Sequence, residues 1–376
     1  MALQCQCPAG LWRPDGGQCI LLATERQLTA LRPPPNRGNA LGKGSDKRTW
    51  IVGITDHIVP PADIEQGAFP EAEFRFLPDW RKDAASRRGW QEADALLVWH
   101  WRVDTETVAI LDRCKILVRY GVGYDLVDVK ALAARRIPFC NTPDYGTEEV
   151  ADAACGMILA IQRQLVAYDR ACRHFTSGWQ EHTLSPQQRT NCQTLGVIGV
   201  GRIGTAVVLR MKPFGCRILG YDPYKPSGYE KAVGFERVES LDELLARSDI
   251  VTIHCPLTEE TRGMVDARFL AKMKAGASLV NTARGGIFAD LDCLEAALRL
   301  RHLAYAAMDV LPDEPPADHP LLRAWRDDAD WIRGRMIVTP HVAWHSEQGW
   351  YEMRYKAAQT ARMYLVEKRL RNLIEE

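Results

Sequence analysis

Short apolar runs alternate with amphipathic stretches from residue 50 almost to the end of the chain. In the first half this pattern predicts four strands and two helices: strands at 50–54, 95–99, 116–118 and 137–140, and helices at 105–112 and 127–135. Alternation of strands and helices is typical of βαβ units, in which helices join parallel strands. The sequence therefore predicts an α/β fold built on parallel sheets.

The second half begins with a longer apolar pattern, which predicts one continuous helix over 148–174. Thr147 is its expected N-cap, and Glu148 and Glu149 lie next to the positive end of the helix dipole. The elements predicted after it are six strands, an insertion and a last amphipathic helix: strands at 194–198, 218–221, 250–253, 278–280, 304–309 and 336–338, the insertion at 323–335 and the helix at 347–368.

Residues 1–48 do not share this alternation. They contain a run of three prolines, several glycines and no periodic apolar pattern with which to join a core. We interpret them as a flexible extension whose removal leaves folding and activity nearly intact. Three cysteines fall in this segment, Cys5, Cys7 and Cys19, but no histidine or fourth cysteine nearby completes a set of metal ligands. No metal site is predicted.

Composition narrows the class of protein. The 48 basic and 48 acidic side chains give a formal net charge of zero, and a nucleic-acid-binding protein normally carries a clear basic excess. No apolar run reaches the ~18 residues needed to span a bilayer, and the first ten residues show no secretory pattern. Eleven cysteines are scattered without a disulfide framework. These features predict a cytoplasmic protein that binds neither nucleic acid nor a membrane.

A glycine-rich turn follows the first strand of the second series and opens a helix. Gly199 permits the tight turn, Gly201 leaves room for a pyrophosphate, and Gly204 lets helix and strand pack closely. Arg202 and Ile203 lie between Gly201 and Gly204 in this Gly-x-Gly-x-x-Gly motif. Its free amides lie at a helix N-terminus, which is a favourable place for phosphate. The motif predicts a dinucleotide site.

Asp222 strengthens this interpretation, because it ends the next strand, 18 residues after Gly204. A carboxylate there accepts hydrogen bonds from the ribose hydroxyls and repels a 2′-phosphate. The sequence therefore predicts NAD rather than NADP as the cofactor. Glycines that serve only a tight turn are the alternative interpretation.

Three polar segments follow later strands of the same series, where a Rossmann sheet places its carboxyl-edge crevice. They contain Arg284, Glu314 and His341. The fork of an arginine binds a carboxylate in a bidentate manner, and histidine exchanges a proton near neutral pH. A carboxylate beside an imidazole favours its protonated form and fixes its orientation. Each residue also has a plainer interpretation: a surface arginine, a loop carboxylate, and a core or capping histidine.

With these motifs in order, the chain from about residue 50 onward resembles the D-2-hydroxyacid dehydrogenase family. A further matching piece is the segment from His254 through Pro256 to Thr258. The resemblance implies that Arg284, Glu314 and His341 are the catalytic residues, and that Asp309 lies near the nicotinamide carboxamide. The cofactor-binding residues it implies are Gly199, Gly201, Arg202, Ile203, Gly204, Asp222, His254, Pro256, Thr282, Arg284, Asp309 and His341.

Within the family the chain most resembles the carboxy-terminal-binding-protein branch, which shares an Arg-x-Gly-x-Gly loop, a histidine in the place of His100 and a tryptophan in the place of Trp344. The implied substrate-binding residues are His100, Arg119, Tyr120, Gly121, Val122, Gly123 and Trp344. Together with Trp99 and Trp101, the aromatic residues of this set predict an aromatic-lined pocket and a substrate with an apolar side chain. Tyr305, where the family commonly has glycine, and the insertion at 323–335 depart from the family pattern.

The resemblance implies two Rossmann-like, doubly wound parallel-sheet domains. They are a flavodoxin-like substrate domain of 49–148, completed by 337–376, and a dinucleotide-binding domain of 149–336. The implied reaction interconverts a 2-oxoacid and a D-2-hydroxyacid with NAD, in a homodimer that uses the nucleotide domain and the helix from Glu148. Two alternatives stay open: an NAD(H)-sensing, corepressor-like binding protein, and hydride transfer on another substrate, such as phosphite, by the same three residues.

Overall fold

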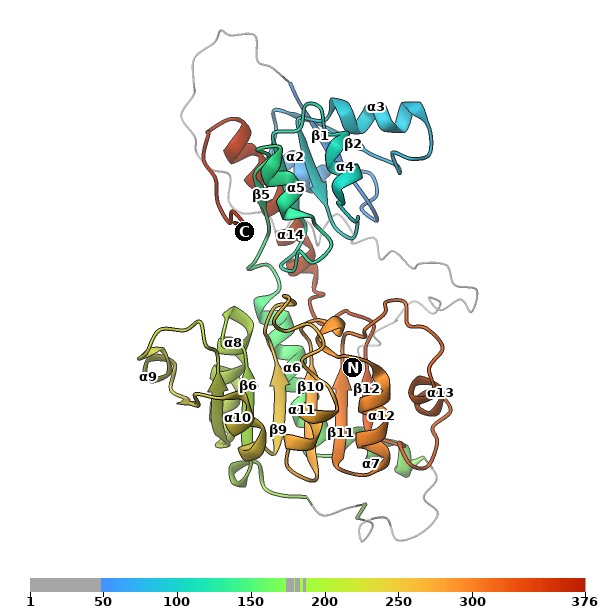
Figure 1. Ribbon diagram of the computed structural model, residues 1–376, viewed down its shortest axis with the longest axis vertical. Coiled ribbons are helices and arrows are strands. Elements are labelled where there is room, and N and C mark those ends of the chain that lie inside the picture. The colour runs from blue at the N-terminus through green and yellow to red at the C-terminus, as the bar shows by residue number, and fades with distance from the viewer. Residues whose placement is uncertain (1–48, 174–178, 180–182, 185–186, 376) are drawn as a thin grey trace, which may run out of the picture. The chain divides into compact units, whose positions relative to one another are not determined.

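Two parallel sheets organise the residues that the structure describes, which are 49–173, 179, 183–184 and 187–375 of a computed structural model (Figure 1). The prediction of an α/β fold with two doubly wound sheets is confirmed. The flexible extension predicted for 1–48, with its three cysteines, lies outside the described residues.

The first sheet has five strands in the order β2-β1-β3-β4-β5, all parallel. Its elements are β1 (Trp50–Ile54), α2 (Asp63–Ala68), β2 (Ala72–Phe76), α3 (Ala84–Glu92), β3 (Ala95–Val98), α4 (Thr105–Ala109), β4 (Ile116–Arg119), α5 (Val129–Ala134) and β5 (Phe139–Cys140). The sequence did not predict β2, α2 or α3. Strand β2 is a half-exposed edge strand, and both helices are short, so none of the three carries a strong apolar pattern.

Each face of the five-stranded sheet is covered by helices. One face packs against α2 and against α14 (Glu347–Leu365), which comes from the far end of the chain. Met353, Ala357, Ala358 and Ala361 of α14 have no exposed surface there. The other face forms a separate core with residues of α3, α4 and α5. The predicted final helix at 347–368 is therefore an integral part of the first sheet's domain.

The second sheet has seven parallel strands in the order β12-β11-β10-β9-β6-β7-β8. Its strands are β6 (Thr194–Ile198), β7 (Arg217–Tyr221), β8 (Glu236–Arg237), β9 (Ile250–Ile253), β10 (Ala277–Asn281), β11 (Leu303–Met308) and β12 (Met336–Val338). Six of them were predicted from the sequence; β8 has only two residues and was not. The helices of this sheet are α6 (Thr147–Gln162), α7 (Leu165–Cys172), α8 (Arg202–Met211), α9 (Tyr229–Val233), α10 (Leu241–Arg247), α11 (Ala267–Lys272), α12 (Leu291–Arg299) and α13 (Pro320–Arg326). One core joins the sheet to α6 and α8, and the other joins it to α10, α11 and α12.

The prediction of one helix over 148–174 is wrong. The chain forms α6 and α7, which meet at an angle of 59°. Between them Gln164 has a φ of 53°, in the left-handed region, and its N–H bonds to Ile161 O rather than continuing the α-helical ladder. The expected N-cap is also displaced by one residue: Gly146 is the N-cap and Thr147 is the first helical residue. In the described part of the chain no single helix is long and apolar enough to cross a membrane, and only α6 and α7 taken together pass that test.

Residues 323–335, interpreted as an insertion, complete α13 and then pack against the sheet. Ile332 is 1% exposed, and the Arg299 guanidinium lies 3.9 Å from the Trp331 ring. Strand β12 follows and pairs with β11, so it belongs to the seven-stranded sheet. This pairing corrects the predicted boundary between residues 336 and 337, because the chain leaves the second sheet only after Val338.

Candidate active site

The strand order of the seven-stranded sheet creates a crevice at the carboxyl ends of β6 and β9. Strands β6 and β9 are neighbours in the sheet. After β6 the chain continues to β7 on one side, and after β9 it continues to β10 on the other side. Ligands of open α/β sheets bind at such a switch point. The glycine turn follows β6 and His254 follows β9, so both predicted cofactor segments lie at this crevice.

The glycine turn has the geometry that a pyrophosphate requires. Gly199 has a φ of 83°, which favours glycine, and a Cβ on Gly204 would lie 2.0 Å from Gly199 O. Apart from its own chain neighbours, no atom of the described residues lies within 4 Å of the Cβ position of Gly201, which opens helix α8 as its N-cap. Arg202 is exposed and Ile203 is half-buried beside it. The turn therefore leaves open space in front of a helix N-terminus, as dinucleotide binding needs.

Asp222 directly follows β7 and holds the same turn. Its Oδ2 accepts a hydrogen bond of 2.9 Å from Val200 N–H, and its Oδ1 accepts one of 3.1 Å from Tyr224 N–H. Each oxygen keeps a second lone pair for a ribose hydroxyl. Two buried side-chain atoms near the same edge, His254 Nδ1 and Thr282 Oγ1, have no hydrogen-bond partner within the described chain. Such atoms indicate that a polar ligand completes the site.

Burial lowers the pKa of His254 to about 3, so this imidazole is neutral at physiological pH. Its Nε2 is 2.9 Å from Thr252 Oγ1. Pro256 is exposed two residues further on, and its carbonyl accepts from Thr261 Oγ1. The 254–256 segment therefore lines the crevice without adding a charge to it.

Arg284 extends from the turn that follows β10. Asn281 shapes this turn, because its side chain accepts from Ala283 N–H and donates to Arg284 O. A Cβ on Gly285 would lie 1.7 Å from Leu311 O, so only glycine lets this turn approach the one after β11. The two turns are thereby held together, and they carry Arg284 and Glu314.

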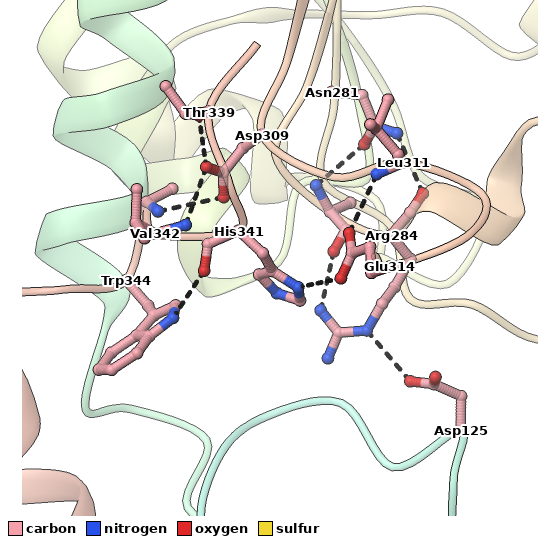
Figure 2. Close-up of polar contacts among 12 residues, drawn as sticks. Asp125, Asn281, Arg284, Asp309, Leu311, Glu314, Thr339, His341, Val342 and Trp344 are labelled. Carbon is pink, nitrogen blue, oxygen red and sulfur yellow. Dashed lines mark hydrogen bonds and ion pairs between the residues drawn. The ribbon is translucent and has the colours of Figure 1, made fainter. Parts of the chain in front are cut away.

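Figure 2 shows that Arg284, Glu314 and His341 converge. His341 Nδ1 is 2.7 Å from Glu314 Oε2, and Glu314 Oε1 accepts from Leu311 N–H. Burial raises the pKa of Glu314, but the hydrogen bond and the charge of His341 outweigh it, and the net shift is downward. Glu314 is therefore a carboxylate at neutral pH, and it leaves His341 Nε2 as the ring nitrogen that faces a ligand.

Asp309 fixes the backbone around His341. The buried carboxylate accepts hydrogen bonds from Thr339 Oγ1 and from the N–H groups of Val342 and Ala343 (Figure 2). His341 has a φ of 54°, an uncommon conformation for a residue with a side chain, and its own N–H donates to Asp309 O. Asp309, predicted to lie near the nicotinamide, is thus first of all the support of the histidine loop.

The substrate loop predicted at 119–123 approaches Arg284. A Cβ on Gly123 would lie 1.6 Å from Arg284 Nη2, so the guanidinium rests against the loop backbone. The Gly121 N–H donates to Thr142 Oγ1 at 2.6 Å and is not available to a substrate. Within the described residues, the N–H groups of Val122 and Gly123 donate to no protein group. In the part of the chain that the structure describes, these two amides are therefore available to a ligand.

Positive charge gathers around this loop. Burial, followed by the positive charge of Arg284, lowers the pKa of Arg119 to about 10. Protein atoms surround much of the His100 ring, although the residue keeps an exposed surface. This partial burial, and then the positive charge of Arg119, lowers the pKa of His100 to about 4. Two arginines that face the same space beside a neutral histidine favour an anionic ligand group.

The aromatic residues divide into two sets. Trp344 donates from Nε1 to His341 O at 2.9 Å, and its ring lies 5.6 Å from Trp99 and 6.0 Å from Trp350. Tyr120 is completely buried and donates to Glu65 in the core, so the prediction that its side chain binds substrate is wrong. Trp101 packs on Trp90 at the core of α3, α4 and α5, so it does not belong to the tryptophan cluster of Trp99, Trp344 and Trp350.

Sequence reasoning missed two residues of this site. Asp125 Oδ1 accepts from Arg284 Nε at 3.0 Å (Figure 2); the residue lies two positions after Gly123, and no sequence pattern indicated its pairing with Arg284. Trp350 joins the tryptophan cluster from α14, where the amphipathic pattern gave no sign of a role beyond packing.

The chain is similar to a family model, to related proteins and to solved structures. The family model described as "D-isomer specific 2-hydroxyacid dehydrogenase, NAD binding domain" matches residues 155–343, half of the chain. A D-3-phosphoglycerate dehydrogenase of Mycobacterium tuberculosis is 37% identical over 293 residues, which are 78% of this chain and 52% of that protein. The C-terminal-binding protein 1 of Caenorhabditis elegans is 34% identical over 279 residues, 72% of this chain and 37% of that protein.

The chain thus spans about half the length of the mycobacterial relative and less of the nematode one. Among solved structures, a D-lactate dehydrogenase from Aquifex aeolicus, in complex with NAD and lactic acid, is similar with a TM-score of 0.72 and 26% identity. That match covers 86% of this chain and 98% of the other.

Proposed function

Because the chain belongs to the family of D-isomer-specific 2-hydroxyacid dehydrogenases, we propose that it is an NAD-dependent enzyme that interconverts a 2-oxoacid and a D-2-hydroxyacid. The observation that carries the proposal is the 2.7 Å contact between His341 Nδ1 and Glu314 Oε2, next to Arg284. A histidine oriented by a carboxylate at the crevice of a dinucleotide-binding sheet is suited to a proton transfer that accompanies hydride transfer.

The reductive direction uses each of these residues. Bound NADH supplies the hydride that the keto carbon receives. His341 gives the proton on Nε2 to the carbonyl oxygen, while Glu314, a carboxylate at neutral pH, holds the opposite ring nitrogen. Arg284 and the free amides of Val122 and Gly123 hold the carboxylate of the substrate. The seven-stranded sheet then belongs to the dinucleotide domain, and the five-stranded sheet with α14 to the substrate domain.

A panel of 2-oxoacids assayed with NADH tests the proposal. We expect turnover with at least one member, and best with an apolar side chain, since the tryptophan cluster of Trp99, Trp344 and Trp350 lies beside His341. Absence of turnover across the panel, with NADH still bound, would favour the corepressor-like binding protein instead.

Asp222 is expected to set the choice of cofactor. Its carboxylate faces the ribose and repels a 2′-phosphate, so kcat/KM with NADH should exceed that with NADPH by at least ~10-fold, about 1.4 kcal/mol. The variant Asp222→Asn keeps an oxygen that accepts from a backbone N–H but loses the charge, so it should narrow the preference. Equal efficiency of the natural protein with both cofactors would refute this role.

We further propose a homodimer. The apolar residues of α6, including Met157, Ile158 and Ile161, are buried within the protomer and offer no surface to a second chain. Support comes from α7, which has no buried side chain and begins with Leu165, 56% exposed. Light scattering at micromolar concentration should give twice the 42.3 kDa of one chain. A single-chain mass would count against the dimer.

We also propose a cytoplasmic location. The eight cysteines within the described residues are all free thiols, as a reducing compartment would maintain them. Recovery of the tagged protein in a secreted fraction would contradict this location.

A further inference from the structure

A second cavity lies at the amino ends of the strands of the seven-stranded sheet, at the edge opposite the glycine turn. Its volume is about 340 Å³. It is lined by Gln162 at the end of α6, Ser278 at the start of β10, Tyr305 of β11, and two arginines, Arg301 and Arg335. None of these side chains has a part in the proposed dehydrogenase site.

Part of the cavity wall comes from Arg335, the last residue of the segment 323–335 that the sequence analysis interpreted as an insertion. The structure fixes that insertion firmly: Asp328 pairs with Arg170 of α7, and a Cβ on Gly334 would lie 2.6 Å from Ala167 Cα. These contacts with α7 therefore hold this wall of the cavity in place.

One end of the cavity is electropositive. The Arg335 guanidinium donates to four backbone carbonyls, those of Leu298, Leu303, Ala304 and Trp331. Within the described residues no carboxylate forms an ion pair with Arg335 or Arg301. Burial, and then the positive charge of Arg301, lowers the pKa of Arg335. Asp249, a carboxylate of the cavity wall, is paired with Lys274 at 3.0 Å, so the two arginine cations still favour the binding of an anion at their end.

Another part of the wall offers an acceptor that lacks a donor. Gln162 is 6% exposed, and its Nε2 donates to Gln193 Oε1 at 2.7 Å. Its Oε1 is buried and receives no hydrogen bond from the described residues. A buried acceptor without a donor is unfavourable, so a ligand that brings an O–H or N–H group to Gln162 would be stabilised.

We propose that this cavity binds a small carboxylate that carries a hydroxyl or ammonium group on the adjacent carbon. The carboxylate lies towards Arg301 and Arg335, and the hydrogen-bond donor lies towards Gln162 Oε1. The volume is at the lower end of the range for ligand pockets and suits a molecule of this size.

Calorimetric titration of the full chain, without dinucleotide, tests the site with three probes. Glycolate carries a carboxylate and a hydroxyl, glycine a carboxylate and an ammonium, and acetate a carboxylate alone. We expect glycolate or glycine to bind with a Kd on the order of 1 mM, and acetate at least ~10-fold more weakly. No binding of glycolate and glycine, or equal affinity for acetate, would overturn the proposal.

Matched variants locate the binding. Arg301 has a φ of 55°, which asparagine tolerates, so Arg301→Asn should fold and should weaken the binding at least ~10-fold. Arg268→Gln, at an exposed arginine of α11 outside the cavity, should leave it unchanged. Thermal unfolding confirms that each variant is folded. Binding that Arg284→Lys weakens and Arg301→Asn does not would belong to the dehydrogenase site, and would refute this inference while supporting the proposed function.

Discussion

Replacement of His341 by glutamine is expected to lower kcat for 2-oxoacid reduction by roughly 100-fold or more, the range for loss of a positioned acid–base group. The imidazole is the side chain that Glu314 orients, and its Nε2 is the proposed proton donor. Affinity for NADH should change little, because the proposed cofactor contacts at the glycine turn and Asp222 lie elsewhere in the crevice. Steady-state kinetics on the best substrate of the panel, with NADH titrated by fluorescence, measure both quantities. Unchanged reduction by His341→Gln would show that the mechanism is wrong.

Glu314→Gln is the companion variant, because it keeps a side chain of similar shape and removes the charge. The pKa of the Glu314 carboxyl is lowered, so this group stays ionised below its usual range and does not itself titrate near neutral pH. Without that charge the protonated imidazole is less favoured. Reduction needs the protonated form, so its pH–rate profile should move to lower pH, while oxidation at neutral pH should be less impaired. An unmoved profile would limit Glu314 to a structural role.

The crevice was predictable because its signals are local. The glycine turn is six consecutive residues, and its three glycines are constrained by the tight turn at Gly199, the open space at Gly201 and the close approach at Gly204. Arg284, Glu314 and His341 follow strands β10, β11 and β12, and parallel neighbours place their carboxyl ends together. Membership of the family and the two-sheet fold are confirmed, whereas the individual roles of these residues stay predictions until variants are assayed.

The errors arose where side-chain direction depends on the backbone. Arg119 and Tyr120 are consecutive at the end of β4, and successive strand residues point to opposite faces. Because Arg119 faces the site, Tyr120 faces the core. A motif names consecutive residues and does not say which way each side chain points. The break after α6 was also not predicted, because the apolar pattern continues past residue 164. The backbone of Gln164 is nevertheless left-handed.

Contacts between distant segments had no sequence signal at all. Asp125 and Arg284 are 159 residues apart, and Glu65 and Arg354 are 289 residues apart. Each pair forms only once the strands and helices that carry it are assembled. The pair of Glu65 and Arg354 also has a large energetic effect, because it is buried and each buried charge depends on its partner.

The pair of Glu65 and Arg354 should therefore dominate the stability of the five-stranded sheet's domain. The Glu65 side chain has no exposed surface, that of Arg354 is 8% exposed, and Nη2 lies 2.6 Å from Oε2. Tyr120 donates to the same carboxylate at 3.0 Å. Arg354→Met leaves Glu65 buried without a cation, and we expect it to lower the free energy of unfolding by about 3–5 kcal/mol. Urea unfolding followed by tryptophan fluorescence measures the loss.

Two further variants distinguish the effect of leaving the Glu65 charge unpaired from a general loss of stability of α14. Lys356→Met removes a cation on the same helix whose partners, Asp144 and Glu352, are about half exposed, so it should cost at most about 1 kcal/mol. The double variant of Glu65→Leu with Arg354→Met removes both charges and should recover most of the stability, apart from the acceptor that Tyr120 loses. If Arg354→Met costs no more than Lys356→Met, the buried pair does not stabilise the domain as its burial and geometry indicate.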